Sequence, residues 1–131
     1  PVVGVPTLEI VAYPLRDQKL PVWAIAGAGR GRIWTACYAT RKKRWQISVD
    51  PYLTTIEELA QQINEPSLCI GEIDEESANT LQRASKHKAR VVSPSTRLRR
   101  AGHLAEIGTA RLEAGDQDDP DALVPIYISS P

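Results

Sequence analysis

The hydrophobic pattern of this chain changes its period once, and that change limits the folds that the chain can adopt. Residues 22–26 are continuously apolar, and residues 33–40 are rich in β-branched and aromatic side chains. Residues 45–49 alternate between apolar and polar side chains, which is typical of a strand with one solvated face. Its apolar positions, expected on one face, are Trp45, Ile47 and Val49. Three successive strand patterns predict an antiparallel meander.

After the meander, the apolar positions recur at helical spacing. Thr54 and Glu57 have the spacing of a capping box and predict the start of a helix. The predicted helices are 7–13, 54–63, 75–86 and 95–115, and the predicted short strands are 67–70 and 89–92. Gly115 supplies a left-handed stop for the longest helix. The helical positions expected to face inward are Leu8, Val11, Ala12, Ile56, Leu59, Ala60, Ile63, Ala78, Leu81, Ala84, Leu98, Ala101, Leu104, Ala105, Gly108 and Leu112.

The order of elements after the first helix is therefore β-β-β-α-β-α-β-α. A meander followed by strand-helix-strand units folds as one mixed sheet, because the later strands need right-handed crossovers. This is the ribonuclease-H-like arrangement of the α/β class, which is also one lobe of the actin-like ATPase fold. With 131 residues, 42% of them apolar, the chain has the size for one core. We expect residues 1–131 to form a single lobe.

Charge is balanced overall but uneven along the chain. Sixteen basic and sixteen acidic residues give a formal net charge of zero, which provides no global attraction to nucleic acid or membrane. Residues 57–76 carry acids and no base. The basic residues that are candidates for contact with tRNA or a partner are Arg30, Arg32, Arg41, Lys42, Lys43 and Arg44. Both stretches are either solvated faces or surfaces for a partner.

The glycine-rich stretch 26–32, "AGAGRGR", resembles a phosphate-binding loop but lacks its context. Such a loop precedes a helix whose N-terminus faces the phosphate, whereas a strand pattern follows here. A five-residue hairpin loop suits the glycines better. If 33–40 is a strand, this turn and the turn at 41–44 lie at its opposite ends, roughly 25 Å apart. We therefore do not expect them to form one basic patch.

Other chemical motifs are missing from the sequence. Cys37 and Cys69 lie in apolar stretches without a CxxC partner, so we expect buried free thiols. His87 and His103 are expected on the surface, and no carboxylate ends the first strand, where ribonuclease-H-like nucleases hold metal. We expect no cofactor, no metal, no enzyme activity and a cytoplasmic location without a membrane segment. A chain without methionine that begins with proline is expected to be a fragment.

Several segments together resemble the second half of the TsaB (YeaZ) family. They are "PVVGVPTLEIVA", "AIAGAGRGRIWTACY", "CIGE" and "RRAGHLAEIGTARLEAGDQDDPDALVPIY", of which Gly115–Tyr127 is the most specific. The resemblance implies an N-terminal lobe before Pro1 and a role as non-catalytic partner of the TsaD enzyme in making tRNA threonylcarbamoyladenosine. A TsaE-like ATPase, indirect contact with tRNA and a homodimer are further implied partners. Gly27 and Arg32 depart from the family, which tends to carry acids there.

Two function hypotheses from different classes follow, together with a weaker third. The first is a scaffold subunit that binds and positions a TsaD-like enzyme. The second is an independent nucleic-acid-binding module that uses the basic hairpin turns. The third is an ATP-using enzyme, which predicts nucleotide binding between two lobes; an isolated lobe does not provide that cleft.

Overall fold

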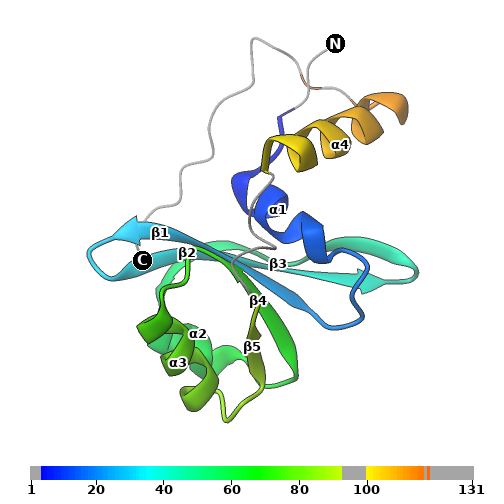
Figure 1. The fold of residues 1–131 in the computed structure, drawn as a ribbon. Coiled ribbons are helices and arrows are strands. Elements are labelled where there is room, and N and C mark those ends of the chain that lie inside the picture. Colours follow the sequence, from blue (N-terminus) through cyan, green and yellow to red (C-terminus); the bar gives the residue numbers. More distant parts are fainter. Residues whose placement is uncertain (1–3, 93–99, 117, 119–131) are drawn as a thin grey trace.

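The computed structural model describes residues 4–92, 100–116 and 118, and shows one five-stranded sheet with helices on both faces (Figure 1). The strands are β1 (Val22–Gly29), β2 (Arg32–Arg41), β3 (Arg44–Thr55), β4 (Ser67–Gly71) and β5 (Ala89–Val91). The helices are α1 (Thr7–Ala12), the 3-10 turn η1 (Tyr13–Leu15), α2 (Ile56–Gln62), α3 (Glu75–Ala84) and α4 (Arg100–Glu113). The predicted order of elements is confirmed.

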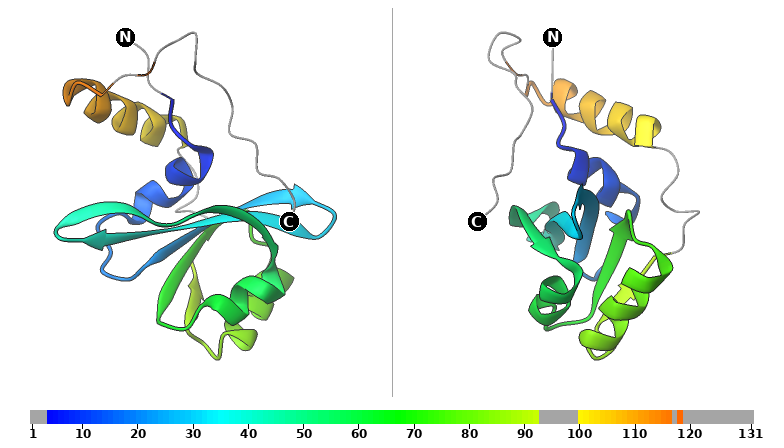
Figure 2. Two further views of the ribbon diagram at one scale, coloured as in Figure 1. Left: turned by 180° about the vertical axis from the view of Figure 1, so that it is seen from behind. Right: turned by 90° about the vertical axis from the view of Figure 1, so that its left-hand side faces the viewer.

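The sheet has the order β3-β2-β1-β4-β5. β1, β2 and β3 pair antiparallel, and β4 and β5 join in parallel through the crossovers that α2 and α3 supply. α1 covers one face of the sheet, and α2 and α3 cover the other (Figures 1 and 2). This mixed sheet is that of a ribonuclease-H-like lobe, as predicted.

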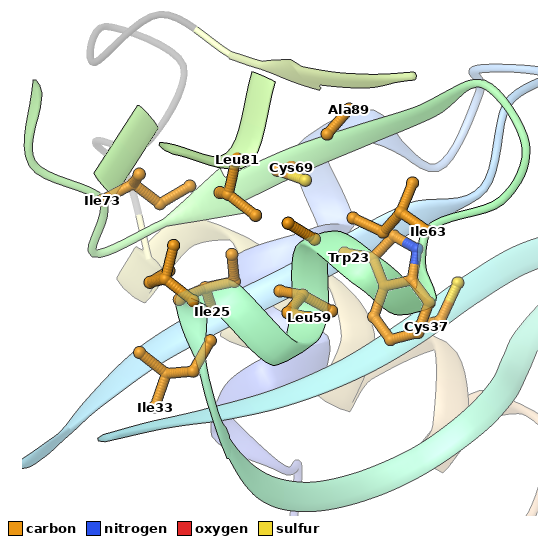
Figure 3. Close-up of a cluster of buried hydrophobic side chains, with 12 residues drawn as sticks. Trp23, Ile25, Ile33, Cys37, Leu59, Ile63, Cys69, Ile73, Leu81 and Ala89 are labelled. Carbon is orange, nitrogen blue, oxygen red and sulfur yellow. The ribbon is translucent and has the colours of Figure 1, made fainter. Parts of the chain in front are cut away.

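Each face of the sheet has its own apolar core. In β1, Trp23 and Ile25 face the α2/α3 side, whereas Val22 and Ala24 face α1. Because both faces of β1 are covered, its sequence is continuously apolar rather than alternating. Figure 3 shows the core on the α2/α3 side, where Leu59 and Leu81 meet Ile25 and Cys69. In the α1 core, Leu8, Val11 and Ala12 are buried, as predicted.

A bulge in β3 contradicts the predicted single apolar face of residues 45–49. Tyr38 pairs with Ile47 but the adjacent Cys37 pairs with Val49, so Ser48 is an extra residue in β3. Trp45 consequently packs on the α1 side, whereas Val49 packs on the α2/α3 side. Ile47 is 41% exposed instead of buried. The sequence prediction failed because period-2 alternation holds only without a bulge.

The predicted capping box is wrong by one residue. β3 continues through Thr55, which pairs with Arg32, so α2 begins later than predicted. The Thr55 hydroxyl accepts a hydrogen bond from the Glu58 N–H at 3.2 Å, and the Thr54 hydroxyl donates to the Glu58 carboxylate at 2.9 Å. Thr54 and Glu57 therefore do not cap this helix, although the predicted inner positions of α2 are all buried.

Two further helical positions also differ from the prediction. Ala84 is exposed at the end of α3, and Ser85 is buried instead, with its hydroxyl accepting from the Ala89 N–H at 3.0 Å. In α4, Ala105 is exposed and Ile107 is the buried side chain. Leu98 lies outside the described residues, as do the side chains of Ala101, His103 and Leu104. Gly115 has the predicted left-handed φ of 82°.

Candidate functional site

The glycine-rich stretch forms a tight hairpin turn, as predicted, but its loop has two residues instead of five. β1 runs to Gly29 and β2 begins at Arg32, which leaves Arg30 and Gly31 as the loop. Both have positive φ, 56° and 74°, which suits a two-residue turn between twisted strands. Arg30 is exposed at this β1–β2 turn, whereas Arg32 is half-buried. The glycines extend the strand pairing, so the loop is shorter than their spacing indicates.

The second basic turn joins β2 to β3 through Lys42 and Lys43. Both have positive φ, 53° and 64°, and Arg41 pairs with Arg44 beneath them. All four side chains of this β2–β3 turn are exposed, and within the described residues none of them forms an ion pair. Four cations on one tip make a concentrated positive charge.

The two basic turns lie at opposite ends of β2, as the sequence predicted (Figure 1). β2 has ten residues. At about 3.3 Å per residue, its ends are roughly 30 Å apart. The six candidate residues therefore form two separate tips and no single patch.

Most acids of residues 57–76 lie at the same end of the sheet as the β1–β2 turn. α2 begins beside Arg32, which pairs with Thr55, and β4 ends at Gly71, which pairs with Ile25. We call this group the acidic end: Glu57, Glu58, Glu72, Asp74, Glu75 and Glu76. Glu65 follows α2 and lies toward the opposite end. The acidic stretch is therefore divided between the two ends of the sheet. The β1–β2 turn lies close to the acidic end, whereas the β2–β3 turn lies at the opposite end of β2.

The acidic end is organised by backbone contacts. The Ser77 N–H donates to the Asp74 carboxylate at 2.7 Å, which caps α3 and holds the pKa of Asp74 below its usual range. The Gly27 N–H donates to the Glu72 carboxylate at 2.9 Å, which ties Glu72 to the end of β1. Among the described residues, no three His, Cys, Asp or Glu side chains gather as a metal site.

A contact that the sequence did not reveal joins α4 to the segment before α1. Arg111 forms ion pairs with Asp116 at 2.9 Å and Asp118 at 3.6 Å, and its guanidinium also donates to the Gly4 carbonyl. Asp118 in turn accepts from the Gly4 N–H at 2.7 Å. We call Gly4, Arg111, Asp116 and Asp118 the Arg111 clasp. In the sequence, only the acidic run after α4 indicated the Arg111 clasp.

Both cysteine thiols, Cys37 and Cys69, are buried and free, as predicted. Burial raises the pKa of each, that of Cys69 to about 12. His87 is exposed, which also agrees with the prediction. In residues 4–92, 100–116 and 118, no helix is long and apolar enough to cross a membrane.

The order β3-β2-β1-β4-β5 and the directions of its strands define the fold as a ribonuclease-H-like lobe of actin-like architecture. Among solved structures, the chain is similar to YeaZ from Pseudomonas aeruginosa, with a TM-score of 0.60 and 15% sequence identity. The match covers 98% of this chain and 59% of the YeaZ chain, so this chain spans less than two thirds of its neighbour. No protein-family model matches the sequence. No curated protein sequence matches it either. The likeness to YeaZ establishes the fold alone.

Proposed function

We propose that this chain is the C-terminal lobe of a TsaB-like subunit that supports tRNA threonylcarbamoyladenosine formation. The observation that carries the proposal is the structural likeness to YeaZ over 98% of the chain. A second feature supports it: the "GDQDD" segment at 115–119, part of the strongest sequence resemblance, supplies Asp116 and Asp118 to the Arg111 clasp. In this proposal an N-terminal lobe accompanies residues 1–131.

In this role the lobe acts as a scaffold rather than as an enzyme. It binds and positions a TsaD-like catalytic subunit, together with a TsaE-like ATPase, and meets tRNA only through them. The end of β1, where ribonuclease-H-like nucleases carry a carboxylate, has Gly27. The acidic end and the β2–β3 turn present opposite charges at separate places and offer two surfaces for such partners.

Co-purification of the intact gene product with the TsaD homologue of the same organism tests the proposal. We expect a stoichiometric complex, and deletion of the gene should lower threonylcarbamoyladenosine in total tRNA, measured by mass spectrometry of nucleosides. Charge reversal at the acidic end (Glu57→Lys with Glu58→Lys) and at the basic tip (Lys42→Glu with Lys43→Glu) are matched variants that locate the surface. Absence of a complex, with unchanged tRNA modification after deletion, would rule the proposal out.

A nucleic-acid-binding module is the second candidate, because the four cations of the β2–β3 turn have no ion pair within the described residues. Retention of tRNA should then fall steeply with salt. Lys42→Gln with Lys43→Gln should weaken retention severalfold, whereas Arg30→Gln at the other tip should change it little because the acidic end is close. Equal binding by the double variant and the wild type would exclude this tip.

Self-association is the remaining expectation from the resemblance. Two large apolar side chains are exposed: Leu20, just before β1, by 38%, and Ile47, on β3, by 41%. Sedimentation velocity over a hundredfold concentration range tests it, and Ile47→Asn should weaken any dimer that uses this surface. A concentration-independent monomer would contradict the expectation.

A further inference from the structure

A hollow of about 340 Å³ opens on the α2/α3 side of the sheet, at the end where β1 and β4 begin. Its walls come from β1, β2, β3 and the C-terminal end of α2, segments far apart in the sequence. The lining side chains that the argument uses are Trp23, Arg41, Ser48, Tyr52, Gln62 and Glu65. The volume is at the lower end of the roughly 300–1,000 Å³ that small-molecule sites occupy.

The floor of the hollow is apolar and partly aromatic. Trp23 lies beside Ile63 and Cys37 in the core, as Figure 3 shows, and its ring also lines the hollow. Tyr52 adds a second aromatic ring from β3. The Cys37 thiol at the floor stays protonated because burial raises its pKa. A flat, uncharged ring fits such a floor through stacking and apolar contact.

The Ser48 bulge in β3 places two neighbouring residues, Ser48 and Val49, at the hollow. Because Ser48 is the extra residue, Val49 turns onto the α2/α3 side and Ser48 lies at the rim. The Ser48 hydroxyl donates to the Cys37 carbonyl at 3.3 Å. The Tyr52 hydroxyl donates to the Gln62 side-chain carbonyl, which leaves the Gln62 amide nitrogen as a donor at the rim.

The rim of the hollow carries one positive and one negative side chain, Arg41 and Glu65. Arg41 lines the hollow from β2, is exposed, and has no ion pair among the described residues. Glu65 lines it from the loop after α2 and offers a carboxylate acceptor. An anionic group is therefore attracted to the Arg41 side and repelled from the Glu65 side.

We propose that this hollow binds a nucleoside 5′-monophosphate unit. The base lies against Trp23 and Tyr52, the phosphate pairs with Arg41, and Glu65 accepts a hydrogen bond from a ribose hydroxyl or an exocyclic amine. A free mononucleotide and one nucleotide of a single strand share this chemistry. The site lies within one lobe and does not depend on the scaffold role proposed above, so its failure leaves that role untouched.

The three tryptophans allow a sharp test by two-dimensional NMR of the indole N–H signals. Trp23 lines the hollow, whereas Trp34 and Trp45 pack on the opposite face of the sheet. Adenosine 5′-monophosphate and uridine 5′-monophosphate should shift the Trp23 signal saturably while the other two serve as internal controls. Adenosine without phosphate should bind at least fivefold more weakly, and inorganic phosphate alone should not shift Trp23.

A hexanucleotide of uridine distinguishes the two sources of the nucleotide. Binding tenfold tighter than that of the monophosphate identifies a single strand as the source, whereas equal affinity identifies the free nucleotide.

Two variants and one control decide the assignment. Arg41→Gln should lower the affinity for the monophosphate at least fivefold, to that of adenosine. Ser48→Phe, which fills the hollow from the rim, should abolish the Trp23 shift. Lys43→Gln, on the same turn but outside the lining, should change the affinity less than twofold.

The Trp34 and Trp45 signals report whether each variant is folded. No saturable Trp23 shift at about 10 mM nucleotide, on the order of the weakest useful affinities, overturns the proposal. Equal shifts of all three indoles, or unchanged binding by a folded Arg41→Gln protein, overturn it as well.

Discussion

The Trp45 indole stacks on the Tyr38 ring, with ring centroids 5.0 Å apart and an interplanar angle of 20°. Tyr13 from η1 meets the same indole edge-on at 6.1 Å. These three rings connect the β2–β3 hairpin to the segment after α1. Because Trp45 is half-buried, Trp45→Ala should lower the free energy of unfolding by about 2 kcal/mol. Urea denaturation measures this loss. Ile47→Ala is the matched control on the same strand and face, and should cost less than about 1 kcal/mol; equal losses would contradict the role of the stack.

Removal of the Tyr38 hydroxyl, in contrast to removal of the Trp45 ring, is not expected to lower stability. It is buried and has no hydrogen-bond partner among the described residues, and burial raises the pKa of Tyr38. An unsatisfied buried hydroxyl lowers stability, so Tyr38→Phe should be neutral or stabilising by up to about 1 kcal/mol. Thermal and urea unfolding of the variant check this. A loss of more than about 1 kcal/mol would mean that the hydroxyl has a partner in the folded protein.

The corrected helix cap can be tested directly. Thr55→Ala removes the acceptor for the Glu58 N–H and should cost about 1 kcal/mol. Glu57→Gln changes the residue that the sequence pattern named, and should cost about 0.5 kcal/mol or less, through the helix dipole alone. The free energies of unfolding of the two variants decide between the two registers. A larger loss for Glu57→Gln would restore the predicted capping box.

Two glycines with positive φ should differ greatly in their tolerance of alanine. A Cβ on Gly71, with φ of 132°, would lie 2.0 Å from the Ile25 carbonyl oxygen and force β1 and β4 apart. Gly71→Ala should therefore cost more than about 3 kcal/mol or prevent folding. Gly31 has φ of 74° and no atom within 4 Å of the place that a Cβ would take, so Gly31→Ala should cost about 1 kcal/mol. Circular dichroism with urea titration distinguishes the two, and similar stabilities would be inconsistent with this strand packing.

Stability should fall at alkaline pH. Burial raises the pKa of Cys69 from 9.0 to about 12 and also raises that of Cys37. Above pH 9 the unfolded chain therefore loses protons that the folded chain keeps, and the free energy of unfolding decreases as pH rises toward 12. The slope for Cys69 is at most about 1.4 kcal/mol per pH unit. Urea midpoints at pH 8, 9, 10 and 11 measure it, and Cys69→Ala should make the dependence shallower. A midpoint that is constant over this range, or an unchanged slope in the variant, would refute the explanation.

The sequence predicted the fold well where one local rule was sufficient. β1 is predicted correctly because burial on both faces requires the continuous apolar run at 22–26. α2 is predicted correctly because burial of one stripe requires the helical spacing of Ile56, Leu59 and Ile63. The bulge at Ser48 could not be predicted, because its cause is the pairing of β3 with β2. The shifted cap at Thr55 has the same origin.

The candidate sites divide in the same way. The two basic turns were found by composition, and their separation followed from the length of one strand. The hollow was not predicted, because Trp23, Arg41 and Glu65 approach one another only when α2 returns to the sheet. The Arg111 clasp was likewise hidden, because 107 positions separate its arginine from Gly4.

The placement of two short loops at the ends of one continuous strand sets a condition on any partner. Neither loop can approach the other, because β2 is paired on both sides and holds their spacing at roughly 30 Å. A short peptide or a single nucleotide can engage only one tip. A long, stiff partner that reaches both would gain avidity from the fixed spacing, since binding at the first tip raises the effective concentration at the second. The lobe would then distinguish partners by their length as well as by their charge.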